Sequence, residues 1–150
     1  MKPFIIERIQ TLPTTLDTAW DFFSDPVNLA RITPPGMDFR ITSTHSITYA
    51  GQIITYTLRP FFGISMGWIT EITHVSKPDF FVDEQRFGPY RFWHHQHFFR
   101  EVEGGIEVRD LVHYLLFHDR MAGLMNRLFI APRLKKIFDY RAQGLQQIFT

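Results

Sequence analysis

The sequence predicts a single α+β domain over residues 1–150, in which a curved antiparallel sheet wraps around one long C-terminal helix and encloses an apolar cavity. Three observations lead to this fold class. Short apolar patterns with helical spacing follow the first strand, and a run of segments with the alternation of strands follows them. The chain then returns to helical spacing over its last segment. No repeat, linker or low-complexity stretch divides it, and 150 residues suit one domain better than two.

The N-terminal part is expected to form one strand and two short helices. Residues 4–12 are apolar and β-prone, which predicts a strand. Thr14 or Thr15 then offers an N-cap for an amphipathic helix over 15–24. Residues 27–32 are expected to add one or two helical turns before a Pro-Pro-Gly sequence breaks the chain.

Strands joined by short turns make up the middle of the chain. Six are expected, over residues 39–43, 52–59, 65–75, 80–86, 90–102 and 106–117. The pair Gly104-Gly105 is a strong hairpin signal between the last two. Consecutive strands with such connections form an antiparallel meander. With the N-terminal strand, the sheet has about seven strands.

The segment 121–149 is expected to be the long helix. Apolar residues recur in it at spacings that fit one helix face. Pro132 lies inside the segment, and because proline removes a backbone donor, a kink is expected near Ile130. Only this element is long enough to cover the sheet, and a strongly curved sheet that grips one helix leaves room for a cavity.

Composition narrows the functional classes. Sixteen basic and fifteen acidic residues give a net charge of +1, which argues against a nucleic-acid-binding protein. The absence of cysteine excludes disulfides, thiolate nucleophiles and cysteine-ligated metal centres. No phosphate-binding loop is present, so no nucleotide cofactor is expected. No signal-peptide core or apolar run of roughly 18 residues is visible, so a cytoplasmic location without stable membrane insertion is expected.

Several short motifs occur in an order that resembles one known superfamily. They lie at residues 20–29, 32–35, 81–85, 88–95, 97–99 and 110–114. Together they resemble the START-like helix-grip superfamily, also called SRPBCC, over essentially the whole chain. Its members include lipid-transfer domains, plant pollen-allergen-type proteins, polyketide aromatase/cyclases and coenzyme-Q-binding proteins. The resemblance implies a helix-grip fold and a small apolar or amphipathic ligand (a lipid, quinone or polyketide-like compound) held between the sheet and the C-terminal helix.

Side-chain alternation along the strands predicts which residues face the cavity. If Gly104-Gly105 forms a two-residue turn, Phe99 lies opposite Asp110, and His97 lies diagonally beside Asp110 on the inner face. In the strand over 80–86, the family resemblance implies that Phe81, Asp83 and Gln85 also point inward. The candidate ligand-binding residues are therefore Trp68, Phe81, Asp83, Gln85, Trp93, His95, His97, Phe99, Asp110 and Tyr114.

The inward Asp and His admit three interpretations. Asp110 and His97 are weak candidates for proton transfer in a cyclase or dehydrase, provided that both face an open cavity. The favoured interpretation is a purely structural one, in which His97 or neighbouring Arg and Tyr side chains satisfy the Asp110 carboxylate. The cluster 94–97 also suggests a metal, but only His95 and His97 share a face, and a third ligand would have to come from Asp110 or Asp83. No metal site is therefore predicted.

An aromatic pair and a group of basic residues lie outside the predicted cavity. Phe61-Phe62 lies in an expected connection, where it favours a gate or plug of the cavity over membrane contact. A third hypothesis has this apolar surface docking a partner chain or a second copy. The basic residues of the last helix are interpreted as its solvated face, at Arg133, Lys135, Lys136 and Arg141.

Overall fold

The computed structural model describes residues 1–44, 47–118 and 120–150. Its strands are β1 (Phe4–Leu12), β2 (Arg40–Ile41), β3 (Gln52–Leu58), β4 (Met66–Ser76), β5 (Phe80–Phe87), β6 (Phe92–Val102) and β7 (Gly105–Leu115). Its helical elements are α1 (Leu16–Phe23), α2 (Pro26–Arg31), the 3-10 turn η1 (Pro35–Met37), α3 (Ala122–Met125), the π turn η2 (Asn126–Ile130) and α4 (Ala131–Ile148). All seven strands form one sheet in the order β1-β7-β6-β5-β4-β3-β2, with antiparallel neighbours. The predicted fold class is confirmed.

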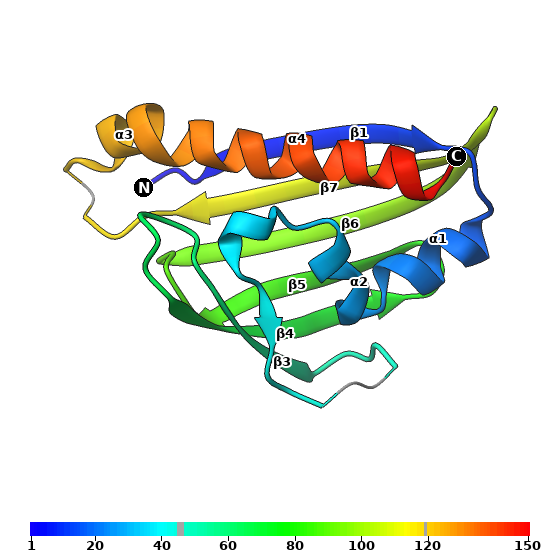
Figure 1. Cartoon of the computed structure of the whole chain (residues 1–150), viewed down its shortest axis with the longest axis horizontal. Coiled ribbons are helices and arrows are strands. Elements are labelled where there is room, and N and C mark those ends of the chain that lie inside the picture. The colour runs from blue at the N-terminus through cyan, green and yellow to red at the C-terminus, as the bar shows by residue number, and fades with distance from the viewer. Residues whose placement is uncertain (45–46, 119) are drawn as a thin grey trace.

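The helices lie on one face of the curved sheet. Figure 1 shows α4 running along β1 and β7, while α1, α2 and η1 lie in front of the middle strands. Side chains of β1 bind α4 directly, because Arg8 pairs with Asp139 at 3.0 Å and Gln10 donates to the carbonyl of Ala142 at 2.8 Å. The sheet face between α4 and α2 is left to line a cavity. Among the described residues, no helix is long and apolar enough to span a membrane.

Side-chain caps set where the two short helices begin. Thr15, rather than Thr14, caps α1, and its hydroxyl accepts a hydrogen bond from the backbone of Thr18. Asp25 caps α2 by accepting from the backbone of Val27 at 2.9 Å, and Pro26 occupies the first turn of that helix. The two caps allow the chain to reverse direction between α1 and α2.

The register of the β6–β7 hairpin differs from the expected one. Val102 pairs with Gly105, so the turn is Glu103-Gly104, and His97 rather than Phe99 lies opposite Asp110. Gly105 has φ +140°, and a Cβ there would lie 2.0 Å from the carbonyl oxygen of Leu12 in β1. A residue without a side chain is required where β1 approaches this closely. The difference is two residues, so every side chain keeps its predicted face.

The irregularity expected in the C-terminal helix is present. Pro132 cannot donate a backbone hydrogen bond, and the residues just before it form the π turn η2, in which the amide of Ala131 reaches the carbonyl of Asn126. The side chain of Asn126 accepts a hydrogen bond from the Tyr114 hydroxyl at 2.6 Å. This bond joins the π turn to β7, and so fixes where α4 begins relative to the sheet.

Candidate ligand-binding site

A cavity of about 180 Å³ lies between the sheet and the helices. Strands β3 to β6 form its floor, α4 forms one side, and α2 with the chain around η1 forms the other. The cavity is partly open to solvent rather than sealed. Most of its lining is apolar, and the polar lining residues include a group of ionisable side chains on β5, β6 and α4.

Aromatic rings form much of the apolar wall. Trp68 is at the centre of this wall, with ring centroids 5.6 Å from Trp93, 5.7 Å from Tyr90 and 5.9 Å from Tyr56. Trp68 and Trp93 meet edge to face, an arrangement that aromatic pairs prefer. Within the described part of the chain, the buried indole Nε1 of Trp68 has no hydrogen-bond partner. A donor is therefore available within an otherwise apolar wall.

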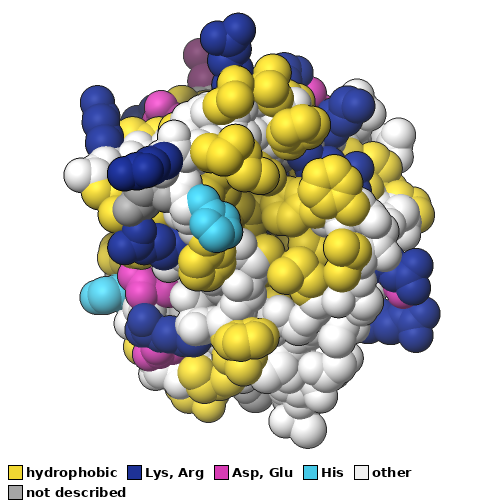
Figure 2. Space-filling model, turned by 90° about the vertical axis from the view of Figure 1, so that its left-hand side faces the viewer, with side chains coloured by type: hydrophobic (Ala, Val, Ile, Leu, Met, Phe, Trp, Pro, Cys, Tyr) yellow, Lys and Arg dark blue, Asp and Glu magenta, His cyan; other side chains and the backbone are white. Residues whose placement is uncertain are grey.

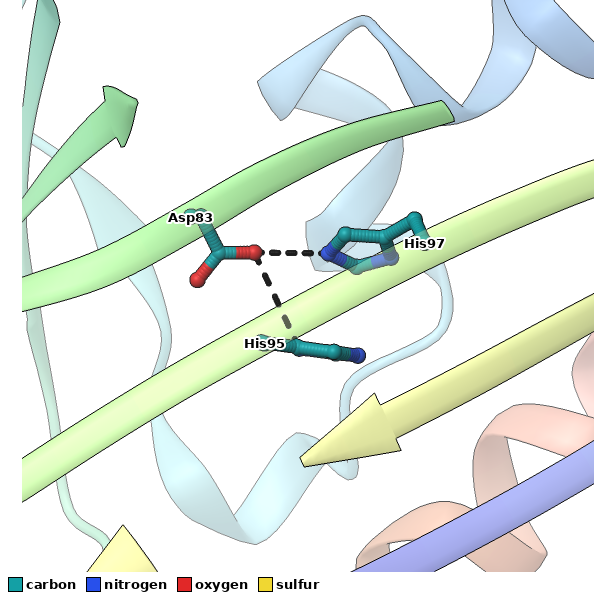
Figure 3. Close-up of side chains that lie close together, drawn as sticks. All are labelled: Asp83, His95 and His97. Atoms are coloured by element: carbon teal, nitrogen blue, oxygen red, sulfur yellow. Dashed lines mark hydrogen bonds and ion pairs between the residues drawn. The ribbon is translucent and has the colours of Figure 1, made fainter. Parts of the chain in front are cut away.

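Four ionisable side chains from three adjacent strands form a polar cluster, which we define as Asp83, His95, His97 and Asp110. Strand pairing places Asp83 opposite His95 and His97 opposite Asp110, all on the inner face. Figure 3 shows the Asp83 carboxylate directed at the two imidazoles. Its Oδ2 atom accepts a hydrogen bond from His97 Nε2 at 2.6 Å and lies 3.7 Å from His95 Nδ1.

Asp110 holds the same two imidazoles from the other side. Its Oδ1 atom accepts a hydrogen bond from His95 Nε2 at 2.9 Å. Nδ1 of His97 lies 3.0 Å from that oxygen, within ion-pair distance but without the alignment of a full hydrogen bond. Each histidine is therefore held between two carboxylates, which determines the orientation of both rings.

Burial and charge act in opposite directions on the carboxyls of the cluster. Burial by itself would raise the pKa of Asp110, but the nearby Arg141 guanidinium, the hydrogen bond from His95 and the close contact with His97 hold that pKa well below its usual range. Burial likewise opposes the ionisation of Asp83, but the two histidines and Arg141 outweigh it and lower its pKa. Both carboxyls are therefore ionised at neutral pH.

The two histidines are shifted in opposite directions. Burial, together with the neighbouring His97, lowers the pKa of His95. Burial also disfavours charge on His97, but its contacts with Asp110 and Asp83 outweigh that cost and raise its pKa. His97 therefore takes a proton more readily than His95 does. When His97 is protonated, its charge and that of Arg141 balance the two carboxylates.

The interpretation of Arg141 as part of a solvated helix face is wrong. Its side chain is only 11% exposed, lines the cavity, and lies 4.0 Å from Asp110 Oδ1. Its Nε atom is buried and has no hydrogen-bond partner among the residues that the structure describes. The missed signal was in the sequence, because position 141 follows Phe138 by three and precedes Leu145 by four, and both of these are buried. Lys135 and Lys136 are exposed, as expected.

The structure brings six of the ten candidate residues to the cavity wall. These are Trp68, Phe81, Asp83, Trp93, His95 and His97. The lining also includes residues that the sequence did not single out, among them Tyr56, Thr70, Leu134 and Phe138. Tyr56 and Thr70 have the same alternation as Trp68, and their hydroxyls form a hydrogen bond of 2.9 Å. Whether these residues bind a ligand remains a prediction.

The other four candidates do not line the cavity. Asp110 lies behind the two imidazoles, and Phe99 packs beside Trp20 and Phe81 in the core. The Gln85 amide bonds to the backbone of Tyr90 at both its nitrogen and its oxygen, and so supports the β5–β6 turn. Tyr114 is 1% exposed and directed at the π turn η2. The alternation of side chains along a strand predicts which face of the sheet they occupy. Whether an inward side chain lines the cavity depends on how its neighbours pack around it.

Phe61 and Phe62 have different environments. Phe61 packs edge to face on Tyr90 of the cavity wall, next to Pro60, which lines the cavity. Arg133 does not point only to solvent, because its Nε donates to the carbonyl of Pro60 at 3.2 Å. Phe62 is 81% exposed. Figure 2 shows apolar side chains gathered over this end of the molecule, where the β3–β4 connection and the segment before α4 lie.

Comparison with known proteins shows the fold. No family model and no curated protein matches this chain. Among solved structures, ginseng major latex-like protein 151 from Panax ginseng superposes with a TM-score of 0.73 at 10% identity, over 100% of this chain and 99% of that one. Protein Ms6760 from Mycobacterium smegmatis gives 0.68 at 15% identity, over 96% of this chain and 92% of that one. TTHA0849 from Thermus thermophilus gives 0.68 at 13% identity, over 96% and 95%.

These similarities extend over nearly the whole chain, so the described residues share the fold of these structures. At such low identities they establish the architecture and leave the ligand and the chemistry to the residues of the site.

Proposed function

We propose that this protein binds a small apolar or amphipathic molecule in the cavity between the sheet and α4. The observation that carries the proposal is an open cavity whose wall is aromatic and whose polar groups are gathered at Asp83, His95, His97 and Arg141. Ligand sites commonly combine an apolar lining with a few placed polar groups. The apolar body of the ligand would lie against Trp68 and Trp93, and its polar end would face the cluster.

The cavity volume limits the size of the ligand. A cavity of roughly 150 Å³ holds benzene, and drug-sized ligands commonly need about 300 Å³ or more. At about 180 Å³, this cavity suits a compact molecule of one ring. A long lipid, a quinone with its tail or a polycyclic polyketide would have to extend out of the cavity or require its wall to move. A single-ring quinone head group or a small phenolic compound is the class that fits best.

Native mass spectrometry of the freshly purified chain tests the proposal, with organic extraction to identify any molecule released. We expect a compact aromatic compound, or binding of an added fluorescent aromatic probe that such compounds displace. A chain that co-purifies with no molecule and binds none of a panel of one-ring and two-ring compounds contradicts the proposal.

Two isoleucines in β3 provide a matched pair of variants. Ile54 is buried and lines the cavity, whereas its neighbour Ile53 is 50% exposed on the other face. Ile54→Phe places an additional ring in the cavity, and overpacking of this kind costs about 1–3 kcal/mol. We expect Ile54→Phe to lose probe binding and Ile53→Phe to keep it. Equal binding by the two variants would place the probe outside the cavity.

Proton transfer on a bound ligand is a second candidate, favoured by the opposite pKa shifts of His95 and His97 within the cavity lining. Asp110 does not line the cavity, so the pairing of Asp110 with His97 as two groups in contact with a ligand is not available. Asp110 would instead position both imidazoles. Turnover of the extracted compound by the wild type, with a pH profile that moves in Asp110→Asn, tests this role.

A further inference from the structure

Three residues of the polar cluster that line the cavity carry side chains that can bind a metal ion. Asp83, His95 and His97 each offer one ligand atom, and these atoms all lie within 4.8 Å of one another. All three residues line the cavity. The sequence did not predict the site because two histidines on one strand are too few, and pairing of β5 with β6 supplies Asp83 as the third ligand.

The orientation of the imidazoles is the second observation. Asp110 Oδ1 lies 2.9 Å from His95 Nε2 and 3.0 Å from His97 Nδ1. One carboxylate oxygen therefore accepts a hydrogen bond from Nε2 of His95 and lies beside Nδ1 of His97. The other nitrogen of each ring, Nδ1 of His95 and Nε2 of His97, is directed at Asp83 (Figure 3). In metal sites, a ligating histidine almost always donates its other N–H to a carboxylate, carbonyl or water, which fixes the ring and the tautomer.

We propose that Asp83, His95 and His97 bind one divalent transition-metal ion of the zinc type, with Asp110 as the carboxylate that orients both imidazoles. Imidazole nitrogen and carboxylate oxygen are ligands that zinc accepts, whereas magnesium and calcium prefer sites made of oxygen alone. Three protein ligands leave a fourth position, as in catalytic rather than structural zinc sites. Here that position faces the cavity, where water or an oxygen of a bound molecule would occupy it.

The required movement is small. Tetrahedral ligands at about 2.0–2.1 Å from zinc lie about 3.4 Å from one another. The Asp83 Oδ2 atom is 2.6 Å from His97 Nε2 and 3.7 Å from His95 Nδ1. The Asp83–His97 pair therefore has to open by about 0.8 Å, and a pair at the 4.8 Å limit would have to close by about 1.4 Å. Rotation of the Asp83 side chain, which is 15% exposed, provides part of this adjustment.

The inference is independent of the proposed organic ligand, because zinc ions alone test it. Equilibrium dialysis of the untagged, chelator-treated full chain against Zn²⁺, with metal analysis, should give one ion per chain, and Mg²⁺ at the same concentration should give none. Zn²⁺ should also raise the thermal midpoint of the wild type. The visible spectrum of bound Co²⁺ should report four or five ligands rather than six.

Variants locate the ion. Asp83→Asn keeps the size of the side chain and should lose stoichiometric Zn²⁺ binding together with the thermal shift. Asp110→Asn should weaken binding about 10–100-fold, the usual effect of losing an orienting carboxylate. His97→Gln is a second ligand variant, and unfolding curves without metal establish that each variant is folded.

His94→Gln is the matched control. His94 lies on the same strand but faces the other way, and its Nδ1 lies 2.6 Å from Glu84. It should bind Zn²⁺ as the wild type does. Loss of binding in His94→Gln would place the ion on the outer face and overturn the proposal. Wild-type binding below one ion per chain, or unchanged binding by Asp83→Asn, would also overturn it and leave the cluster as an ion-pair network.

Discussion

Replacement of Arg141 by methionine tests whether the charges of the polar cluster balance as the structure indicates. Methionine keeps the apolar stem of the side chain and removes the guanidinium, which is the main positive neighbour of Asp110. When His97 is protonated, the substitution leaves Asp83 and Asp110 with one positive group between them instead of two. The folded state would then carry an uncompensated buried negative charge, which is costly.

The geometry sets the size of the effect. At 4.0 Å, the Arg141–Asp110 distance, two unit charges attract by about 4 kcal/mol at an effective dielectric constant of about 20. Methionine also removes the cost of burying the guanidinium, so the net loss is smaller than this attraction. With the side chains of Arg141 and Asp110 only 11% and 8% exposed, we expect the free energy of unfolding to fall by about 2–4 kcal/mol at pH 7.

The pH dependence separates charge from packing. In the variant, excess negative charge raises the pKa of His95, which burial and His97 lower in the wild type. A group whose folded-state pKa rises contributes stability below that pKa and loses it as the pH increases. The loss in Arg141→Met should therefore be larger at pH 8 than at pH 6.

Urea denaturation at the two pH values, in a chelating buffer, measures this difference. Lys136→Met is the matched control, because Lys136 lies on the exposed side of the same helix and should change stability very little. A loss below about 0.5 kcal/mol, within the range of ordinary surface substitutions, would refute the charge balance. A loss of equal size at both pH values would show that only packing is affected.

Three further outcomes are expected. Phe138→Ala removes a buried ring of the cavity wall and should cost about 3–5 kcal/mol by urea denaturation, with an enlarged cavity in a crystal structure. The folded state lowers the pKa of Asp110 from its ordinary value of 3.8, so the ionised carboxylate stabilises the folded state above pH 3.8. This stabilisation is lost as the pH falls below 3.8, so the thermal midpoints of the wild type and Asp110→Asn should converge there. Gly105→Ala places a Cβ 2.0 Å from the Leu12 carbonyl oxygen at a φ of +140°, and should lower the free energy of unfolding by about 3 kcal/mol or more in urea. Gly36→Ala is the control and should not lower it, because no described atom lies within 4 Å of the added Cβ.

Local patterns were sufficient to predict most of the architecture. Alternation in 90–102 and 106–117 placed His95, His97 and Asp110 on one face, and this held although the hairpin turn is one residue earlier than expected. When a hairpin turn moves by one residue, the pairing register of the two strands changes by two residues. Because side chains alternate between the two faces with a period of two, each side chain stays on the same face of the sheet. What changed was the partner, because His97 lies opposite Asp110 rather than diagonal to it.

The sequence alone determined the strand order along the chain, the inward parity of the β6 histidines and the irregularity before Pro132, since each depends on residues close together in the chain. Only the tertiary structure decided that Asp83 meets both histidines, that Arg141 enters the cavity, and that four inward candidates do not reach it. These contacts join strands and a helix that are distant in sequence. The distance of α4 from the sheet decides how much space remains between them, and that distance is set by the packing of many side chains at once.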